Sequence, residues 1–215
     1  MKPEPIARES ALDNTAALDA IVRPLGTAKY EIDAAFRDLD GMLATYARDW
    51  GGLDMNPDFQ RGHVWTAGQQ QHYIENVLRG VVSSGGFVVQ FNCPNWDNDC
   101  YDSAAGGLPR GLQCIDGLQR VTAVQKFLAG EVKPFGLEVQ ELESSSYSMR
   151  RSRFRFRLAV HTFEHRADLL AHYLDLNEGG TPHSGLELAR VRAMLNQAKA
   201  EGAPDETKTG RKARP

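Results

Sequence analysis

The chain has 215 residues, a formal net charge of −3 and a 41% share of hydrophobic residues, which suits one domain of ordinary size with a packed core. No apolar run approaches the length that spans a bilayer, and the N-terminal stretch MKPEPIARES lacks the apolar core of a signal peptide. These features argue against a membrane protein and favour a cytoplasmic location. The three cysteines form no CxxC pair, so we expect neither a disulfide framework nor a metal site.

Charge is distributed unevenly along the chain. Residues 149–215 carry 13 Lys and Arg against 8 Asp and Glu, whereas the remainder of the chain is acidic. The overall balance excludes a uniformly basic nucleic-acid coat, but it allows a local basic face in the C-terminal third.

The first 30 residues contain three prolines and only a weak helical pattern, so we expect residues 1–30 to form a loosely ordered arm. Apolar residues then recur at steps of three and four, which predicts an amphipathic helix over residues 32–50, ended by the glycines at 51 and 52. A second helix is predicted over residues 68–80. The stripes that these two helices bury are expected to be Ile32, Phe36, Leu39, Leu43, Tyr46 and Trp50, and Tyr73, Ile74, Val77 and Leu78.

Strand patterns follow in the middle of the chain. Short β-rich runs at residues 86–91 and 112–115 flank a polar loop, and residues 151–163 alternate polar and apolar side chains. Helices are predicted directly after Gly117 and over residues 166–176 and 184–198, where Ser184 and Glu187 fit a capping box. The pattern indicates an α+β fold with a small mixed sheet and packed helices over residues 31–200. The polar segment 201–215 is expected to be a disordered tail.

Polar residues crowd the junction between the second short strand and the helix that follows it. Asp116, Gly117, Gln119, Arg120 and Thr122 lie within seven residues. The unpaired N–H groups and dipole of a helix N-terminus favour an anion, and Gly117 allows close approach of a ligand. Arg120 offers a guanidinium for phosphate, and Asp116 offers a carboxylate for magnesium or a ribose hydroxyl. The alternative interpretation is an ordinary N-cap at Asp116 and a solvated Arg120.

A second polar cluster, PDFQRGHVW, lies upstream. Gln60, Arg61 and Trp65 supply an amide, a guanidinium and an aromatic plate, which are groups that hold a nucleotide or a base. The alternative is that Phe59 and Trp65 anchor the core and that the polar residues face solvent.

A third candidate loop is LNEGGTPHS, with Asn177, Gly180 and Thr181. One glycine is explained by the end of a helix, which needs a residue with positive φ. The glycine pair followed by Thr-Pro exceeds that need, so we consider this loop a candidate ligand contact.

The stretch RRSRFRFRL places basic side chains on one face of the strand predicted at 151–163. Their spacing of about 6.6 Å along a strand would allow them to follow a phosphate backbone, so we consider them candidate nucleic-acid contacts. A solvated outer face is the alternative. The four residues are Arg151, Arg153, Arg155 and Arg157.

The three motifs PDFQRGHVW, IDGLQRVTAV and LNEGGTPHSGLELARV occur in an order that resembles the N-terminal domain family of GmrSD-type modification-dependent restriction endonucleases. The resemblance runs from about residue 32 to 195. It implies a ParB/sulfiredoxin-like fold and a role in nucleotide binding and hydrolysis in defence proteins. The family motif Asp-Gly-Gln-Gln-Arg is matched except that Leu118 replaces the first glutamine.

This resemblance implies roles for particular residues. Asp116, Gln119 and Arg120 are the expected catalytic group, with an NTP as ligand and magnesium as a candidate companion ion. The expected nucleotide contacts are Gln60, Arg61, Trp65, Gly117, Thr122, Asn177, Gly180 and Thr181.

Three functions remain open on the sequence alone. The leading hypothesis is a stand-alone, ParB-like nucleotide-binding module, a candidate NTPase, in bacterial or phage defence or counter-defence. The alternatives are a ParB-like nuclease that acts directly on DNA, and a non-catalytic DNA-binding or regulatory module with a decayed pocket. Relatives often carry a second, His-based nuclease domain for which this chain has no room, so DNA and a separate nuclease subunit are candidate partners.

Overall fold

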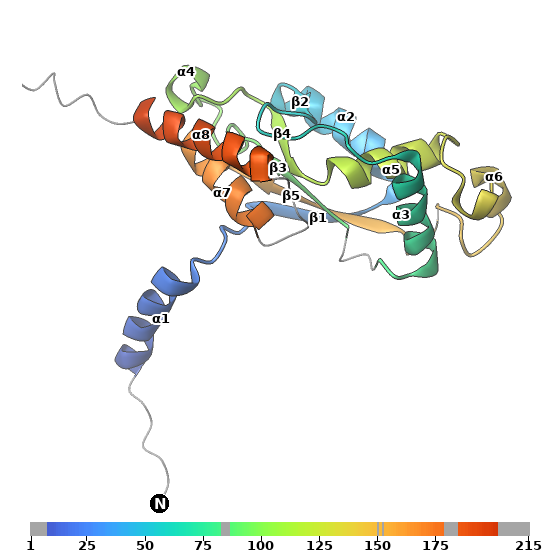
Figure 1. Ribbon diagram of the computed structural model, residues 1–215, viewed down its shortest axis with the longest axis horizontal. Helices are drawn as coiled ribbons and strands as arrows, with labels where there is room; N and C mark the ends of the chain where they lie inside the picture. Colours follow the sequence, from blue (N-terminus) through green and yellow to red (C-terminus); the bar gives the residue numbers. More distant parts are fainter. Residues whose placement is uncertain (1–7, 83–86, 150, 152, 179–184, 202–215) are drawn as a thin grey trace, which may run out of the picture.

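The computed structural model describes residues 8–82, 87–149, 151, 153–178 and 185–201. Within these residues the chain forms one five-stranded mixed sheet in the order β1-β5-β3-β4-β2 (Figure 1). The β1–β5 and β3–β4 pairs are antiparallel, and the β5–β3 and β4–β2 pairs are parallel. The strands are β1 Tyr30–Ala35, β2 Leu53–Asp54, β3 Val88–Asn92, β4 Leu112–Asp116 and β5 Arg155–His161.

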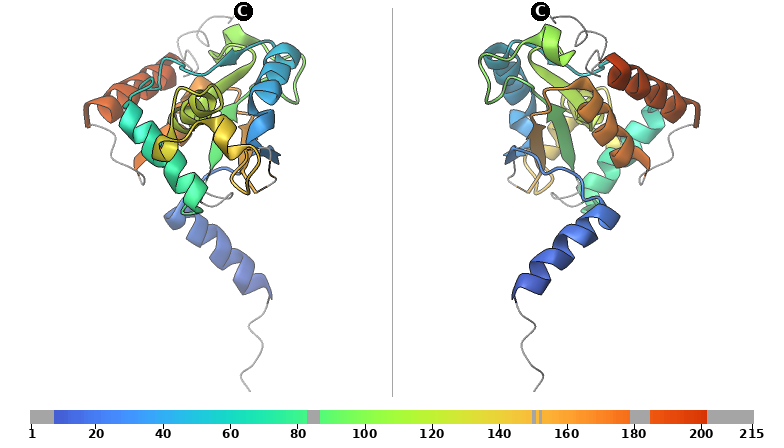
Figure 2. Two further views of the ribbon diagram at one scale, coloured as in Figure 1. Left: turned by 90° about the vertical axis from the view of Figure 1, so that its right-hand side faces the viewer. Right: turned by 90° about the vertical axis from the view of Figure 1, so that its left-hand side faces the viewer.

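Helices cover both faces of this sheet. The larger core cluster packs α2 (Leu39–Trp50), α3 (Ala67–Arg79) and α5 (Leu118–Leu128) against one face. The second cluster packs α7 (Arg166–Glu178) and α8 (Gly185–Glu201) against the other. Figure 2 shows α8 and α2 on opposite sides of the strands. The expected α+β class with a mixed sheet and packed helices is confirmed.

Local sequence explains where α3 begins and ends. Thr66 and Gln69 form a reciprocal capping box at its N-terminus, which satisfies backbone N–H groups that the helix itself leaves unpaired. Gly80 ends the helix in the left-handed conformation at φ +76°, which glycine adopts with little strain. Ile74, Val77 and Leu78 are buried as predicted.

The helix predicted over residues 32–50 is wrong in its first part. Residues Tyr30–Ala35 form β1, followed by a short 3-10 helix, η1 (Phe36–Asp38), and only then by α2. Ile32 fits the helical spacing by coincidence, because the whole stretch pairs antiparallel with β5, with Ile32 opposite Leu158. Tertiary pairing therefore overrides the local period.

The long connections contain short elements that the sequence patterns did not indicate. They are β2, α4 (Ser103–Gly106), η3 (Pro134–Gly136) and α6 (Val139–Leu142). The strand predicted from residue 151 begins at Arg155, and its alternation persists, with Phe156 and Leu158 buried between half-buried arginines. Ser184, the expected capping residue, lies outside the described residues.

The N-terminal segment contains one helix, α1 (Arg8–Val22), which projects away from the sheet and its helices (Figures 1 and 2). Residues 15–25 are exposed, including Ile21 at 79%. The C-terminal residues 202–215 lie outside the described part of the chain. Among the described helices, none has the length and apolar character needed to cross a membrane.

Candidate functional site

Asp116 is the last residue of β4, and the turn that follows it leads into α5, a helix of eleven residues. Gly117 has φ +108°, and a Cβ added there would lie 3.0 Å from the Val89 Cα of β3. Glycine is therefore required by the close packing of this turn against β3. The N-cap residue Gly117 makes no side-chain cap, and the Leu118 N–H at the start of α5 bonds the buried Cys114 side chain.

Arg120 is held at this turn by two contacts. Its Nη2 donates to the Val88 carbonyl over 2.8 Å and pairs with the Asp116 carboxylate at 2.5 Å. The side chain is 26% exposed, and its Nη1 has no hydrogen-bond partner among the described residues. Arg120 thus ties the β4–α5 turn to the start of β3 while keeping one donor nitrogen for a ligand.

A seam between α3 and α5 contains two buried polar atoms without a partner in the described part of the chain. They are the Tyr73 hydroxyl and the Arg120 Nε. Burial raises the pKa of Tyr73 well above its usual value, and the guanidinium of Arg120 opposes part of that rise. The two side chains are therefore close enough to interact, and Tyr73 stays a neutral phenol at physiological pH.

Gln119, expected at the catalytic centre, bonds the upstream loop formed by residues 57–66. Its Oε1 accepts from the N–H groups of Val64 and Trp65 over 3.0 and 3.1 Å, and its Nε2 donates to the Gly62 carbonyl over 2.7 Å. Both ends of the amide are engaged, so the side chain positions this loop against α5.

Gln60 makes a matching contact from the loop itself. Its Nε2 donates to the carbonyls of Cys114 and Ile115 over 2.9 and 2.6 Å, close to the end of β4. Together Gln60 and Gln119 join the loop to both sides of the β4–α5 turn. The structure thus brings the FQR and DGLQR motifs together.

The other end of the loop is held by arginines that sequence reasoning missed. Arg190 of α8 donates to the carbonyls of Asp58, Phe59 and Gln60 over 2.7, 3.4 and 3.0 Å. Arg166 pairs with the Asp58 carboxylate at 2.6 Å. Every residue has a backbone carbonyl, so the sequence does not indicate which carbonyls Arg190 bonds. Only the position of Arg190 on the predicted helix, three residues after Glu187, could have drawn attention to it.

Arg61 differs from its neighbours in this well-anchored loop. Its side chain is half-buried, and it has no hydrogen bond or ion pair among the described residues. It lies within electrostatic range of the Tyr173 hydroxyl of α7, and burial raises the pKa of Tyr173 to about 12. Arg61 and Arg190 oppose that rise, whereas Glu187 and Asp116 add to it. Side chains of the loop, the turn, α7 and α8 therefore converge here.

Two of the expected ligand contacts bond within their own helices. The Thr122 hydroxyl donates to the Leu118 carbonyl over 2.8 Å, and the Asn177 amide donates to the Tyr173 carbonyl over 2.7 Å. Each bond spans one helical turn. Gly180 and Thr181, expected beside Asn177, lie outside the described residues.

Trp65 lies on the loop beside α3. Its ring is tilted against Tyr73, with centroids 5.3 Å apart, and packs partly against the larger core cluster. A hollow of about 550 Å³ opens along it and the first turns of α3. Both interpretations of this tryptophan, core anchor and aromatic plate, thus have a structural counterpart.

The four arginines considered for nucleic acid have contacts within the chain. Arg157 pairs with Asp33 and Glu31 of β1, and Arg155 donates to the Asp33 carbonyl over 2.7 Å. The Arg153 guanidinium lies 4.9 and 4.5 Å from the rings of Tyr147 and Phe154. Arg151 makes a longer bond, 3.4 Å, to the Ser145 carbonyl. Much of this basic row is therefore balanced or stacked locally.

No group of three or more His, Cys, Asp and Glu residues suited to a metal ion occurs among the described residues. Of the acidic residues in the long loop before β4, Asp97 pairs with Lys29 at 3.1 Å and Asp102 accepts from the Ala104 N–H at the start of α4. These contacts give the loop carboxylates structural partners.

The fold and the site define an α+β domain in which a glycine turn leads into a helix that carries Arg120, and a loop that carries Arg61 is bonded to both sides of that turn. A family model for the N-terminal domain of the GmrSD restriction endonuclease matches residues 42–194, from α2 into α8. The chain therefore belongs to this family and is a module associated with restriction endonucleases. Comparisons with curated proteins and with solved structures give no match.

Proposed function

We propose that this domain binds a nucleoside triphosphate between the 57–66 loop and the β4–α5 turn and hydrolyses it, in defence against foreign DNA. The observation that carries the proposal is Arg61, a guanidinium without a protein partner in the described chain on a loop that Gln60, Gln119 and Arg190 hold in place. We further propose that the fold belongs to the ParB/sulfiredoxin-like group, that residues 31–200 form the nucleotide-binding unit, and that residues 1–30 form a loosely attached arm.

The charges at the site suit a polyphosphate. Arg61 approaches from the loop, the N-terminus of α5 lies at the turn, and the Nη1 of Arg120 completes the set. Guanidinium groups and helix N-termini both bind phosphate oxygens well. Arg120 is already positioned by its bonds to Val88 and Asp116, so it gives up little entropy when the ligand binds.

Asp116 is the acidic member of the site. Magnesium is usually held by one or two carboxylates together with the phosphates of the substrate, so a single carboxylate at this turn fits such an ion. Bound magnesium would offset charge that develops on the phosphates. Asp116 itself orients the ion or the attacking water, and its pairing with Arg120 keeps both groups at the turn.

Leu118 marks the departure from the family motif. Its side chain packs against the larger core cluster. The binding set proposed here, Arg61, Arg120 and the backbone of α5, makes no use of the side chain at position 118, so the replacement is compatible with phosphate binding.

Arg61→Ala provides the direct test. Because Arg61 has no protein contact to lose among the described residues, its removal should leave the unfolding free energy within about 0.5 kcal/mol of wild type. It should abolish the thermal stabilisation by ATP, GTP, CTP or UTP with magnesium, and the release of inorganic phosphate. The matched control is Arg48→Ala on α2, whose side chain is exposed and, within the described part of the chain, pairs only with the adjacent Asp49.

Arg120→Ala should behave differently. It loses the bond to the Val88 carbonyl and leaves Asp116 unpaired, so the unfolding free energy should fall by about 1–3 kcal/mol even without ligand. An unliganded domain that is as stable as wild type would contradict this structural role. A wild-type protein that no NTP stabilises, with or without magnesium, would overturn the proposed function.

A further inference from the structure

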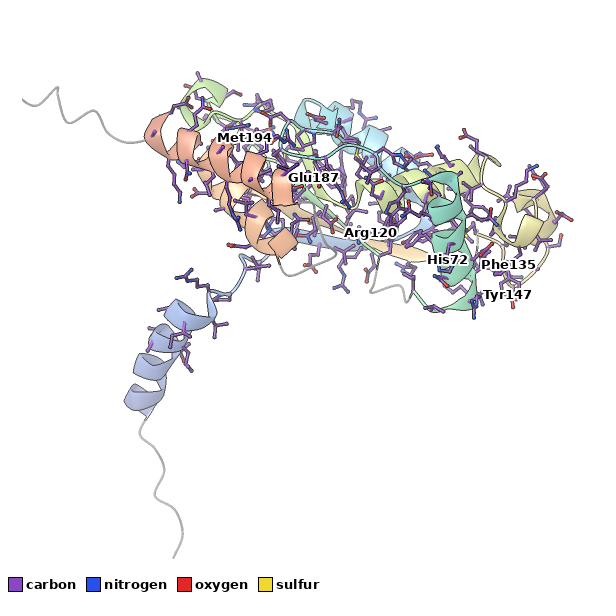
Figure 3. The ribbon with its side chains drawn as sticks, in the orientation of Figure 1. His72, Arg120, Phe135, Tyr147, Glu187 and Met194 are labelled. Atoms are coloured by element: carbon purple, nitrogen blue, oxygen red, sulfur yellow. The ribbon has the colours of Figure 1, made fainter. Side chains whose placement is uncertain are left out.

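The hollow beside Trp65 has the character of a ligand subsite. Its volume is about 550 Å³, within the usual range for small-molecule sites. It is open to solvent along one side of α3, and Figure 3 shows His72, one of its lining residues, on that helix. The lining residues are Trp65, Thr66, Gly68, Gln69, His72, Tyr73 and Asn76.

This hollow shares a wall with the proposed phosphate site. The backbone N–H of Trp65 donates to the Gln119 side chain of α5, one residue from Arg120. Tyr73 lies in the same wall, close enough to Arg120 for the arginine charge to lower the pKa of the phenol. Its ring packs between Trp65 and Phe87. Helices α3 and α5 are in contact along this seam, and Figure 3 shows Arg120 beside α3. The hollow and Arg120 therefore lie on neighbouring elements of the fold.

The chemistry of the lining is that of a base-binding surface. Trp65 supplies an indole ring, and aromatic rings stack on nucleobases of any sequence. His72 and Asn76, one turn apart on α3, bond to each other over 3.1 Å, which orients the Asn76 amide and leaves its oxygen as an acceptor. A flat heterocycle with donor groups on its edge can both stack on the indole ring and donate to the amide oxygen. A sugar or an aliphatic chain can make only one of these two contacts.

We propose that this hollow holds the base of the nucleotide, stacked on Trp65, while the triphosphate extends toward Arg120 and Arg61. The proposal rests on the function proposed above and adds the subsite that distinguishes a nucleotide from a bare polyphosphate. Trp65 is then a binding residue, and the adjoining His72–Asn76 pair sets the preference among bases.

The test compares two ligands on three proteins. Inorganic tripolyphosphate probes the phosphate site alone, and the NTP that binds best to wild type probes both sites. For wild type the NTP should bind more tightly than tripolyphosphate. Trp65→Ala should reduce that advantage by roughly 5- to 150-fold, the range expected for one stacked base, and should leave tripolyphosphate binding unchanged. Trp65→Phe should keep most of the advantage, because it keeps an aromatic plate.

Tryptophan fluorescence gives a second measurement that does not depend on the alanine variant folding. The other two tryptophans, Trp50 and Trp96, stack on each other with centroids 4.4 Å apart, on α2 and in the loop after β3. Base stacking should therefore quench Trp65 selectively, and Trp65→Phe should bind NTP without that quenching. Tripolyphosphate should quench neither protein.

The outcomes separate the two proposals. If Trp65→Ala and Trp65→Phe both retain the full advantage of NTP over tripolyphosphate, the base subsite is refuted and the phosphate site stands. If wild type binds neither ligand, the proposed function itself fails.

Discussion

At the residue scale, the amide side chains carry more of the site's organisation than its charges do. Gln119 satisfies two backbone N–H groups and one carbonyl of the 57–66 loop, and Gln60 reaches two carbonyls of β4. A neutral amide has both donors and acceptors, so one side chain can bridge two backbone segments without burying a charge. The arginines then act on a loop that is already in place.

Gln119→Ala should loosen this loop. Removal of three hydrogen bonds that are partly shielded from solvent should lower the unfolding free energy by about 1–3 kcal/mol in urea denaturation. NTP affinity should fall as well, since the loop carries Arg61. Gln125→Ala on the same helix is the matched control. Among the residues that the structure describes, the Gln125 side chain bonds only the exposed Asp40 carboxylate, so its loss should change stability by less than about 0.5 kcal/mol. Equal effects of the two substitutions would refute the bracing role of Gln119.

At the scale of elements, β5 and α7 meet through a buried histidine pair. His161 and His172 have ring centroids 4.5 Å apart, and Phe163 stacks on His161. Burial, together with the nearby charge of His172, lowers the pKa of His161 from 6.5 to about 4. Burial also lowers the pKa of His172, with Asp175 opposing that shift. Both rings are therefore neutral in the folded protein at pH 7.

This pair predicts a loss of stability in mild acid. When the pH falls below 6.5, these histidines become protonated in the unfolded chain but stay neutral in the folded chain. Unfolding therefore becomes more favourable. Above pH 6.5 the neutral His161 ring does not reduce the free energy of unfolding. Between pH 6.5 and about pH 4 its shifted pKa lowers that free energy progressively, by at most roughly 3 kcal/mol. Urea denaturation at several pH values would measure the slope. His161→Phe should flatten it between pH 6.5 and 4, and an unchanged slope in that variant would assign the acid sensitivity to other groups.

At the scale of the whole molecule, the sheet and its two helical layers form the body, and α1 stands apart from it (Figure 1). The N-terminal segment approaches the body near Gly26, which lies close to the Phe163 ring, and Lys29 then donates its backbone N–H to the Val160 carbonyl. Residues 15–25 bury little surface and contribute little to stability.

Deletion of residues 1–28 should therefore leave the melting temperature within about 2 °C of the full chain and should leave NTP binding intact. Deletion of residues 1–35, which also removes β1, is the control and should unfold the domain, because β5 loses its antiparallel partner. A large drop in melting temperature for the shorter deletion would show that α1 stabilises the body.

The sequence by itself determined the α+β class, the helices α3, α5, α7 and α8, and the cores of β3, β4 and β5, because their periodicities and caps act over a few residues. It also singled out the 57–66 loop and the β4–α5 turn, which the structure brings together. Strand pairing between residues far apart in the sequence could not be predicted. The spacing of Ile32 fits a helix, and only its pairing with Leu158 of β5 places it in a strand. Only the tertiary structure showed that Gln60 and Gln119 bond across 54 to 57 residues to backbone groups, and that Arg190 closes the loop from α8. Hydrogen bonds to backbone atoms place no demand on the identity of the partner residue, so no sequence pattern records them.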